Sequence, residues 1–498
     1  MVLIRPVVGF VVMSVLAAGS GCRSAPLGRF EAAHSAVKAP EFFEPVTPSP
    51  APSNLGAAAA TGPFKTIQPA AFGAEDTAVE SSAQDGDFIV PETLALDTLV
   101  SEVLARNPSL TAAHAAWSAA ANRYPQVVAL DDPMLQTMFA PGSFASNSPV
   151  QSSYYVGFAQ KVPWHGKREL RGEMALWEAN AAAWDTHETR LRLTLATQIA
   201  YFDYYLVLQE QELNRANVRV LEDFRSTARS KYEANLVIAQ DVSLAELELA
   251  KLQQREVELT QQERIAIARI NTLLHRVPQH PLPPPTKKLS ISPQSFDLDR
   301  LVLAAIDQRP ELAALSSRLQ SEQNAAALAC KEYYPDFEIM GRYDAFWTDV
   351  EQRGQVGMNM NVPLNRRRRS AAVDEALFRV SRLRAEYAQL TDTIREDVAA
   401  AAFRLDQARR VAELYERQVL PAAEASLADA QAAYIAGTLD FLRLLSARRQ
   451  LVEEQTGYQR ALADYHRNLA ELARAVGNSA VFLAQSEMPS PAPIGREE

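Results

Sequence analysis

One pattern occurs twice in the sequence, and it decides the fold. "VGFAQKVPWHGKRELRGEMA" covers residues 156–175, and "VGMNMNVPLNRRRRSAAVDEA" covers residues 356–376. Each stretch has alternating residues, then a proline, a basic cluster and a run typical of a helix. Proline has no N–H to donate to a strand's hydrogen-bond ladder. Both stretches therefore predict a strand that ends at a proline and continues as a helix.

Other features recur at nearly the same spacing. "SKYEANL" (residues 230–236) matches "AAYIAGT" (residues 432–438) at an offset of 202. Three pairs of prolines have offsets of 202, 202 and 200: Pro108 with Pro310, Pro133 with Pro335, and Pro163 with Pro363. A nearly constant offset of this size indicates one tandem duplication rather than a solenoid of short repeats.

Long helices are predicted after Pro163 and Pro363. Glycine is sparse in residues 165–275 and 366–477, and Ala, Leu, Glu, Arg and Gln dominate. A run of roughly 68 helical residues would be about 100 Å long. Apolar residues at coiled-coil spacing predict lateral packing against other helices: Leu206, Leu213, Val220 and Phe224. The chain reverses at "EANLVIAQD" and "IAGTLDFLR", so each copy is expected to be a long antiparallel helical hairpin. Pro421 should kink its helix.

Strands are predicted where the periodicity switches to two. In residues 337–347 every second residue from Phe337 to Trp347 lies on one face, against Glu338, Met340, Arg342, Asp344 and Phe346, and residues 154–159 and 356–362 also alternate. Such alternation is typical of a transmembrane barrel strand and equally of a half-buried soluble hairpin. Two strands per copy give four per chain, too few to close a barrel, and an open edge in lipid leaves backbone groups unpaired. Two subunits would supply eight strands and three would supply twelve.

The N-terminal residues predict export. Arg5 precedes an apolar run from Val7 to Ala18, and small residues lead into Cys22, as in a bacterial lipoprotein signal. A plain secretory signal with an incidental cysteine is the alternative. We expect a signal peptide at 1–21, a lipidated tether rich in Ala, Pro and Ser at 22–92, repeats at 93–285 and 286–478, and a disordered tail at 479–498.

Composition excludes several function classes. A net charge of -10 argues against a nucleic-acid partner. Two cysteines provide neither a disulfide framework nor a cysteine metal cluster, and the seven histidines form no i,i+4 pair. The sequence has no nucleophile elbow, phosphate loop, dinucleotide fingerprint or HExxH motif. We expect no enzyme activity, no catalytic or metal-binding residues, and no cofactor.

The duplication, "QKVPWHGKR" (residues 160–168) and the two motifs that begin at Tyr232 and Tyr434 together resemble the TolC family of outer-membrane efflux proteins. "YIAGTLDFLRLLSA" (residues 434–447) resembles that family's tip motif, and the first copy resembles its CzcC- and CusC-like lipoprotein branch. The resemblance covers about residues 95–478. It implies a mainly α fold with a small β part: helical hairpins forming a periplasmic tunnel, and four transmembrane strands per chain in a trimeric barrel.

The resemblance also implies a function. The chain would be the outer-membrane channel of a tripartite efflux system, passively conducting metal ions or small toxic compounds from an inner-membrane pump and its periplasmic adaptor to the exterior. Type I protein secretion, or a periplasmic coiled-coil tether or adaptor, is the alternative. The adaptor would contact the helical tips at Asn235, Leu236, Gly437 and Thr438.

Site residues follow from the same resemblance. The family's acidic tip positions correspond to Arg443 and Ser446 here, while Asp241, the repeat-mate of Arg443, matches an acidic position of the first tip. We therefore predict an Asp241–Arg443 contact that holds the resting state, with Asp440 as the remaining candidate for an acidic ring.

The basic clusters would lie at the junction of barrel and tunnel. They comprise Lys167, Arg168, Arg171 and Arg366, Arg367, Arg368 and Arg369. Cations at a helix N-terminus oppose the helix dipole. Contact with lipid phosphates is one explanation of their placement, and a solvated hydrophilic collar is the other.

Overall fold

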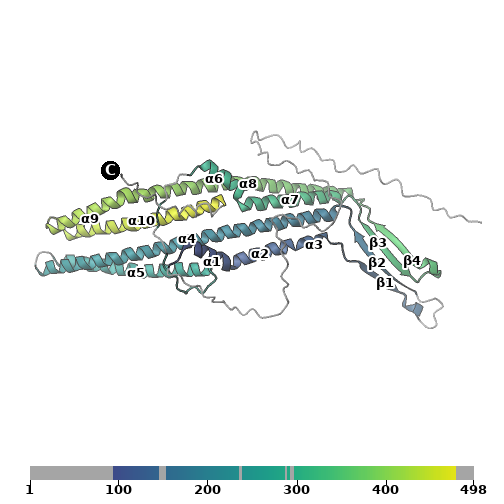
Figure 1. The fold of residues 1–498 in the computed structure, drawn as a ribbon, viewed down its shortest axis with the longest axis horizontal. Coiled ribbons are helices and arrows are strands. Elements are labelled where there is room, and N and C mark those ends of the chain that lie inside the picture. The colour runs from purple at the N-terminus through teal and green to yellow at the C-terminus, as the bar shows by residue number, and fades with distance from the viewer. Residues whose placement is uncertain (1–92, 145–152, 235–237, 286–288, 292–295, 478–498) are drawn as a thin grey trace, which may run out of the picture. The chain divides into compact units, whose positions relative to one another are not determined.

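The computed structural model describes residues 93–144, 153–234, 238–285, 289–291 and 296–477, all within one compact unit that spans Asp85–Glu498 (Figure 1). The first repeat contains α1 (Leu96–Arg106), α2 (Pro108–Ala121), α3 (Arg123–Val128), β1 (Met134–Phe139), β2 (Tyr154–Val162), α4 (Lys167–Glu233) and α5 (Ala239–Leu273). The second contains α6 (Leu298–Gln308), α7 (Pro310–Lys331), β3 (Phe337–Asp344), β4 (Gly354–Met360), α8 (Arg366–Leu414), α9 (Leu420–Ile435) and α10 (Phe441–Val476).

The element order confirms the duplication. Helix α1 corresponds to α6, α2 with α3 to α7, β1 and β2 to β3 and β4, α4 to α8 with α9, and α5 to α10. Pro108 and Pro310 each occupy the first turn of a helix, where the missing N–H has no helical partner to lose. Helices α1 and α6 were not predicted separately. They precede these prolines and are only 11 residues long.

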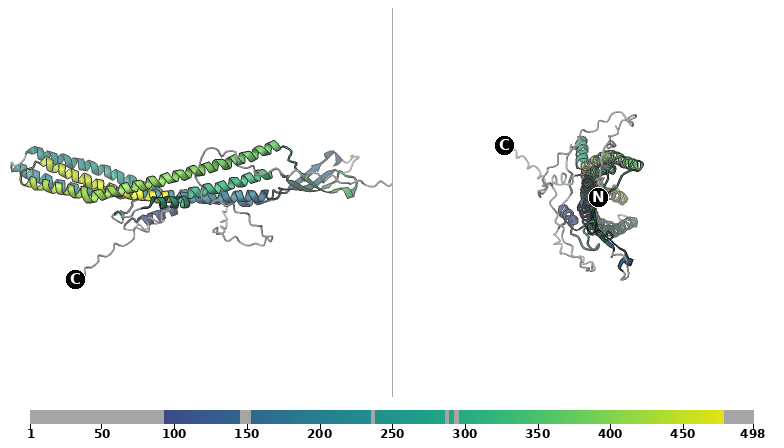
Figure 2. Two further views of the ribbon diagram at one scale, coloured as in Figure 1. Left: turned by 90° about the horizontal axis from the view of Figure 1, so that it is seen from above. Right: turned by 90° about the vertical axis from the view of Figure 1, so that its right-hand side faces the viewer.

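The long helices are present as predicted. Helix α4 has 67 residues, which corresponds to about 100 Å. It reverses into α5, and α9 reverses into α10, so each repeat ends in a helical hairpin. The two hairpins lie side by side in both views (Figures 1 and 2), with α10 packed against α4. No helix in the described ranges combines the length and apolar character needed to cross a membrane.

The helix that contains Pro421 is irregular, as predicted, and the irregularity has a defined form. A π-helical turn, Tyr415–Val419, separates α8 from α9. The proline follows two residues later, in the first turn of α9, and its missing N–H cannot donate to the preceding turn. Tyr415 of the turn lies against Gly457 of α10, where a β-carbon would come within 2.6 Å of the phenol oxygen. The π turn thus accommodates the proline and is seated on the neighbouring helix.

The sheet joins the two repeats. Its order is β1-β2-β3-β4, and all neighbours are antiparallel. The central pair, β2 with β3, brings one strand of each repeat together. The predicted strands are confirmed, although β3 ends at Asp344 rather than at residue 347 and β4 begins at Gly354 rather than at residue 356. Strand β1 was implied by two strands per copy but was not located beforehand.

Candidate functional site: sheet, strand–helix junctions and helical tips

The sheet has one apolar face and one polar face. Register places Leu135, Phe158, Gly341 and Val356 in one row across the four strands, and Gln160, Ile339 and Met358 in another. Many large apolar side chains on this face are exposed, up to 89% for Val356. They are Leu135, Phe139, Val156, Phe158, Ile339, Tyr343, Val356, Met358 and Met360. A contiguous exposed apolar surface of this kind marks contact with lipid or another protein.

The opposite face is polar and internally hydrogen-bonded. Arg342 Nε donates to Gln355 Oε1 at 2.8 Å, and its guanidinium lies 3.5 Å from Asp344 and over the ring of Tyr155. Asn359 donates to Glu338 at 3.1 Å. The alternation of apolar and polar residues is clear in β3 and β4, as in a barrel strand with lipid on one side and water on the other, whereas β1 places Met134 and Met138 on the polar face.

Both edges of this sheet are open. In the described residues β1 pairs only with β2, and β4 pairs only with β3. Each edge therefore presents backbone N–H and C=O groups that can pair with another strand. Closure in an apolar medium would need strands from other chains.

The strand–helix junction of the first repeat contains a buried lysine. The Lys167 side chain is 0% exposed, and its Nζ lies 2.9 Å from Asp336 Oδ1 and 3.5 Å from Glu332 Oε2. Lys167 Nζ also donates to the Tyr334 carbonyl, and the Trp164 N–H donates to Asp336 Oδ1 at 2.8 Å. Burial alone would raise the pKa of Asp336, but the Trp164 N–H and the Lys167 ammonium together hold that pKa below its usual value.

This junction ties the two repeats together. Trp164 stacks on Tyr334 with ring centroids 5.2 Å apart. Gly166 has φ +80, a left-handed conformation that favours glycine, and a β-carbon there would require the Lys331 side chain to move. "PWHGK" is therefore a structural connection between repeats, with Pro163 ending the strand segment as predicted.

The lipid hypothesis is wrong for the first basic cluster. The Lys167 ammonium is buried against the carboxylates of Asp336 and Glu332. Arg168 donates two hydrogen bonds to the Val128 carbonyl near the end of α3, where a cation also suits the helix dipole. Arg171 lies close enough to Asp336 to lower its pKa. Lys167 and Arg168 thus bond acceptors of their own chain.

The second basic cluster is arranged differently. Pro363 lies between β4 and α8, and Arg366, Arg367 and Arg368 are exposed. Asn365 caps α8 by accepting from the Arg368 N–H at 3.1 Å. Arg369 bonds the Glu332 and Asn365 carbonyls.

The second helical tip is built around Gly437. This residue has φ +76 directly after α9, and the Gly437 and Thr438 N–H groups donate to the carbonyls of Tyr434 and Ala433. That is the left-handed glycine end of a helix. Asp440 then caps α10, accepting from the Arg443 N–H at 3.1 Å. Asn235 and Leu236 of the first tip, like Cys22, lie outside the described residues.

The charged residues of the tips lie close together, but Arg443 has a different partner within the chain from the one predicted. Within the single chain Arg443 is 3.9 Å from Asp440, and the described residues contain no Asp241–Arg443 ion pair. Burial, and then the nearby Asp440 carboxylate, raises the pKa of Asp241. Ser446 donates to the Leu442 carbonyl at 2.8 Å. An Asp241–Arg443 contact stays a prediction for the assembled protein.

The two tips meet at an aromatic side chain. Tyr434 of α9 is buried, and Lys231 of α4 lies 3.9 Å above its ring. Burial, followed by the Asp241 carboxylate, raises the pKa of Tyr434. Tyr434 packs on Phe441 at a centroid distance of 5.9 Å. The tips of both hairpins are thus in contact within one chain through residues of the repeated tyrosine motif.

A ladder of polar contacts between the hairpins was not predicted. Arginines of α10 reach carboxylate or amide oxygens of α4 and α5 at five heights. The pairs are Arg448 with Asn217, Arg449 with Glu248, Arg460 with Glu210, Arg467 with Asp203, and Arg474 with Glu188. The arginines at 460, 467 and 474 are spaced by one heptad, a signal available in the sequence.

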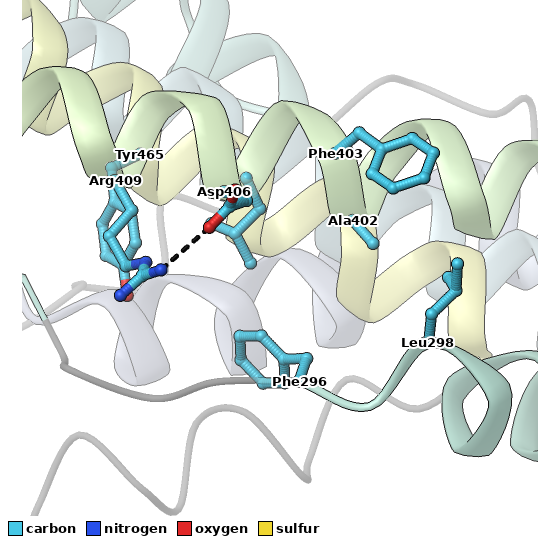
Figure 3. A pocket seen from close by; sticks show the side chains of 8 residues that line it. Phe296, Leu298, Ala402, Phe403, Asp406, Arg409 and Tyr465 are labelled. Atoms are coloured by element: carbon cyan, nitrogen blue, oxygen red, sulfur yellow. Dashed lines mark hydrogen bonds and ion pairs between the residues drawn. The ribbon is translucent and has the colours of Figure 1, made fainter.

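Candidate ligand sites away from these regions are few. The described residues contain no cluster of His, Cys, Asp and Glu able to hold a metal ion. His466 is packed between Phe202 and Tyr465, and burial lowers its pKa to about 4. Figure 3 shows a shallow hollow beside α8 in which Asp406 is paired with Arg409 at 2.8 Å. Its lining is otherwise mainly apolar: Phe296, Leu298, Ala402, Phe403, Leu405 and Tyr465. The hollow offers no converging acid and base.

Known proteins were compared with this chain. Residues 301–478 match the family model of outer membrane efflux proteins. None of the curated proteins matches significantly. The structure resembles CusC, a transmembrane channel, with 16% identity and a TM-score of 0.67 over 77% of this chain and 92% of CusC.

Two further solved structures are similar. The outer membrane protein VceC of Vibrio cholerae is 19% identical with a TM-score of 0.65, covering 77% of this chain and 96% of VceC. The open outer membrane channel MtrE of Neisseria gonorrhoeae is 18% identical with a TM-score of 0.65, covering 77% of this chain and 89% of MtrE. Residues 301–478, which make up most of the second repeat, therefore match the outer membrane efflux protein family, and the chain shares the fold of CusC, VceC and MtrE.

Proposed function

We propose that this protein is the outer-membrane channel of a tripartite efflux system. Three chains would close a twelve-stranded barrel and a helical tunnel through which substrates leave passively. The observation that carries the proposal is the four-stranded sheet with one apolar face and two open edges. A sheet of this kind needs an apolar medium on one side and further strands at both edges.

The helical hairpins support the periplasmic part of the proposal. A helix of about 100 Å is far longer than a compact domain needs. The hairpin tips lie at the far end of α4 from the sheet (Figure 1). Contact with a periplasmic adaptor at Gly437 and Thr438, and at Asn235 and Leu236, would connect the tunnel to an inner-membrane pump.

The cargo is proposed as metal ions or small toxic compounds. The identities and TM-scores of CusC, VceC and MtrE against this chain are similar, so they do not favour one branch of the family. The proposal of the CzcC- and CusC-like branch therefore rests on the sequence motifs.

Lipidation at Cys22 rests on the N-terminal sequence alone and would anchor the chain in the outer membrane. Loss of radiolabelled palmitate on Cys22→Ser, with the protein still exported, would support it.

Conductance in a planar bilayer tests the function. Purified full-length protein should migrate as a heat-resistant trimer and give discrete single-channel currents. Deletion of the gene should increase sensitivity to the exported compounds, and the wild-type gene should restore resistance. A protein that stayed monomeric in detergent and passed no ions would overturn the proposal and favour the tethering alternative.

A further inference from the structure

The two repeats use their basic clusters differently, although both clusters follow a proline at the end of a strand. In the first repeat Lys167 is fully buried on Asp336, and Arg168 bonds the Val128 carbonyl. The equivalent residues of the second repeat have no such arrangement. Arg366, Arg367 and Arg368 are exposed, and the described residues offer their side chains no ion pair. In the second cluster only Arg369 bonds groups of its own chain, the carbonyls of Glu332 and Asn365.

The position of these three arginines is unfavourable within the chain itself. They form the first turn of α8, where helix N–H groups are directed outward and the dipole favours anions. Three adjacent cations also repel one another. Their guanidinium groups carry planar donor sets suited to phosphate oxygens. A bound anion would offset both the unfavourable interaction of the arginines with the helix dipole and their repulsion of one another.

The surface beside the arginines indicates which anion this is. Met358, Met360, Val362 and Leu364 alternate along the chain up to the cluster, and all four are at least half exposed, Leu364 by 83%. They continue the apolar face of the sheet to within two residues of Arg366. An apolar strip that ends in a cationic row matches the boundary between acyl chains and headgroups of a membrane.

We propose that Arg366, Arg367 and Arg368 bind the phosphate groups of anionic glycerophospholipids where the sheet leaves the membrane. This inference rests on the proposed membrane location of the sheet. The lipid phosphates complement the three charges, and the acyl chains cover the apolar strip. Lys167 and Arg168 of the first repeat contribute no cation to this surface, because their side chains bond acceptors of their own chain.

The test compares three forms of the full-length protein in neutral detergent. The first is the wild type, the second R366Q/R367Q/R368Q, and the third R379Q/R382Q/R384Q, which removes the same charge from α8. The control positions lie about 20 Å further along the helix, well beyond the screening length of roughly 10 Å at 0.1 M salt. Binding of fluorescent phosphatidylglycerol and phosphatidylcholine is measured for each form at 0.1 M and 0.5 M salt.

Wild type and the control should prefer phosphatidylglycerol by ten-fold or more at 0.1 M salt, and less at 0.5 M. The R366Q/R367Q/R368Q form should lose most of that preference, and R366K/R367K/R368K should restore part of it. An unchanged preference in R366Q/R367Q/R368Q would overturn the proposal. Loss of the trimer in that variant, with lipid preference intact, would assign the arginines to a neighbouring subunit instead.

Conductance separates this proposal from the proposed function. All forms are also recorded in bilayers of uncharged lipid. Channels that conduct, combined with an unchanged lipid preference in R366Q/R367Q/R368Q, would refute the lipid site and leave the channel function intact. Proteins that never conduct would refute the channel function, while the ratio of the two lipid affinities would still decide the role of the arginines.

Discussion

Lys167 is the residue on which the connection between the repeats depends most directly. Its ammonium is completely buried and pairs with Asp336, which is about one-third exposed. Removing one partner of a buried pair leaves the other uncompensated. Because Asp336 is partly exposed to solvent, the penalty of leaving it unpaired is reduced. Lys167→Met should therefore lower the free energy of unfolding by about 1–3 kcal/mol. Chemical denaturation measures this. Lys331→Met, which removes a bond to the His165 carbonyl only, should cost less than about 1 kcal/mol.

Asp336 also predicts a pH dependence. Its pKa is lowered in the folded protein, because the Trp164 N–H and Lys167 outweigh the effect of burial. A lowered pKa contributes stability above the unfolded value of about 3.9, and that stability is lost as pH falls through the folded value. The melting temperature of the wild type should therefore fall more steeply below about pH 4 than that of Asp336→Asn. Parallel curves for both proteins would contradict the assignment.

Arg443 and Asp241 form the predicted gate of the assembled channel. Arg443 is 77% exposed in the single chain, and Asp241 faces Asp440 instead. Arg443→Ala should therefore leave unfolding free energy within about 0.5 kcal/mol of wild type, yet raise the current of the resting channel. Asp241→Asn should do the same, and the double variant should add nothing further. Unchanged conductance and compound sensitivity in Arg443→Ala would exclude the pair, with Arg417→Ala as a matched exposed control.

Residue roles were only partly predictable from sequence. The motif at residues 160–168 located the junction, but the burial of Lys167 depends on Asp336, which lies 169 positions along the chain. Spacing within one repeat carries no information about that contact. Gly437 was predictable as a tip residue because a left-handed turn after a helix favours glycine.

At the scale of elements, Glu210 is the central contact of the ladder between hairpins. It is 7% exposed and accepts from Arg255 of α5 at 2.6 Å and Arg460 of α10 at 2.9 Å. Glu210→Ala would leave Arg460 without its carboxylate and Arg255 with Glu258 alone, whereas Arg460→Ala leaves Glu210 paired with Arg255. We expect a loss of about 2–4 kcal/mol for Glu210→Ala and less than about 1 kcal/mol for Arg460→Ala. Equal losses, measured by urea unfolding, would contradict this asymmetry.

The sequence predicted how far the long helices extend, but not which of their residues are buried against other helices. The predicted seam residues, among them Leu206 and Leu213, are half-buried, whereas Gln211 and Asn214 are buried. Polar residues can occupy a helix seam when partners satisfy them, as Glu263 does for Gln211 and Glu256 for Asn214. A pattern of apolar residues alone misses such positions. Pro421 signalled an irregular helix, but it did not predict a π turn or the position of Tyr415 against Gly457 of another helix.

For the whole molecule, the duplication was the strongest signal in the sequence. The offsets between paired prolines stay nearly constant even where few residues of the two copies are identical.

The sheet shows why one chain is incomplete. Four strands in the order β1-β2-β3-β4 leave β1 and β4 as edges with unpaired backbone groups. An edge in lipid costs several kcal/mol for each unpaired group. The proposed membrane location therefore predicts that both edges pair with the corresponding edges of other copies.

Cross-linking across these edges tests the assembly. Cysteines are placed in pairs, one among residues 134–139 of β1 and one among residues 354–360 of β4, in a chain with Cys330→Ser. Because a disulfide needs Cα atoms within about 7 Å, only pairs in register between neighbouring chains should oxidise. Those pairs should yield covalent trimers on a denaturing gel, and each single cysteine should yield at most dimers. A control pair at Ala159 and Met340, which face each other inside one chain, should give a cross-linked monomer. Covalent dimers as the largest product of every edge pair would indicate eight strands, and would refute the twelve-stranded channel.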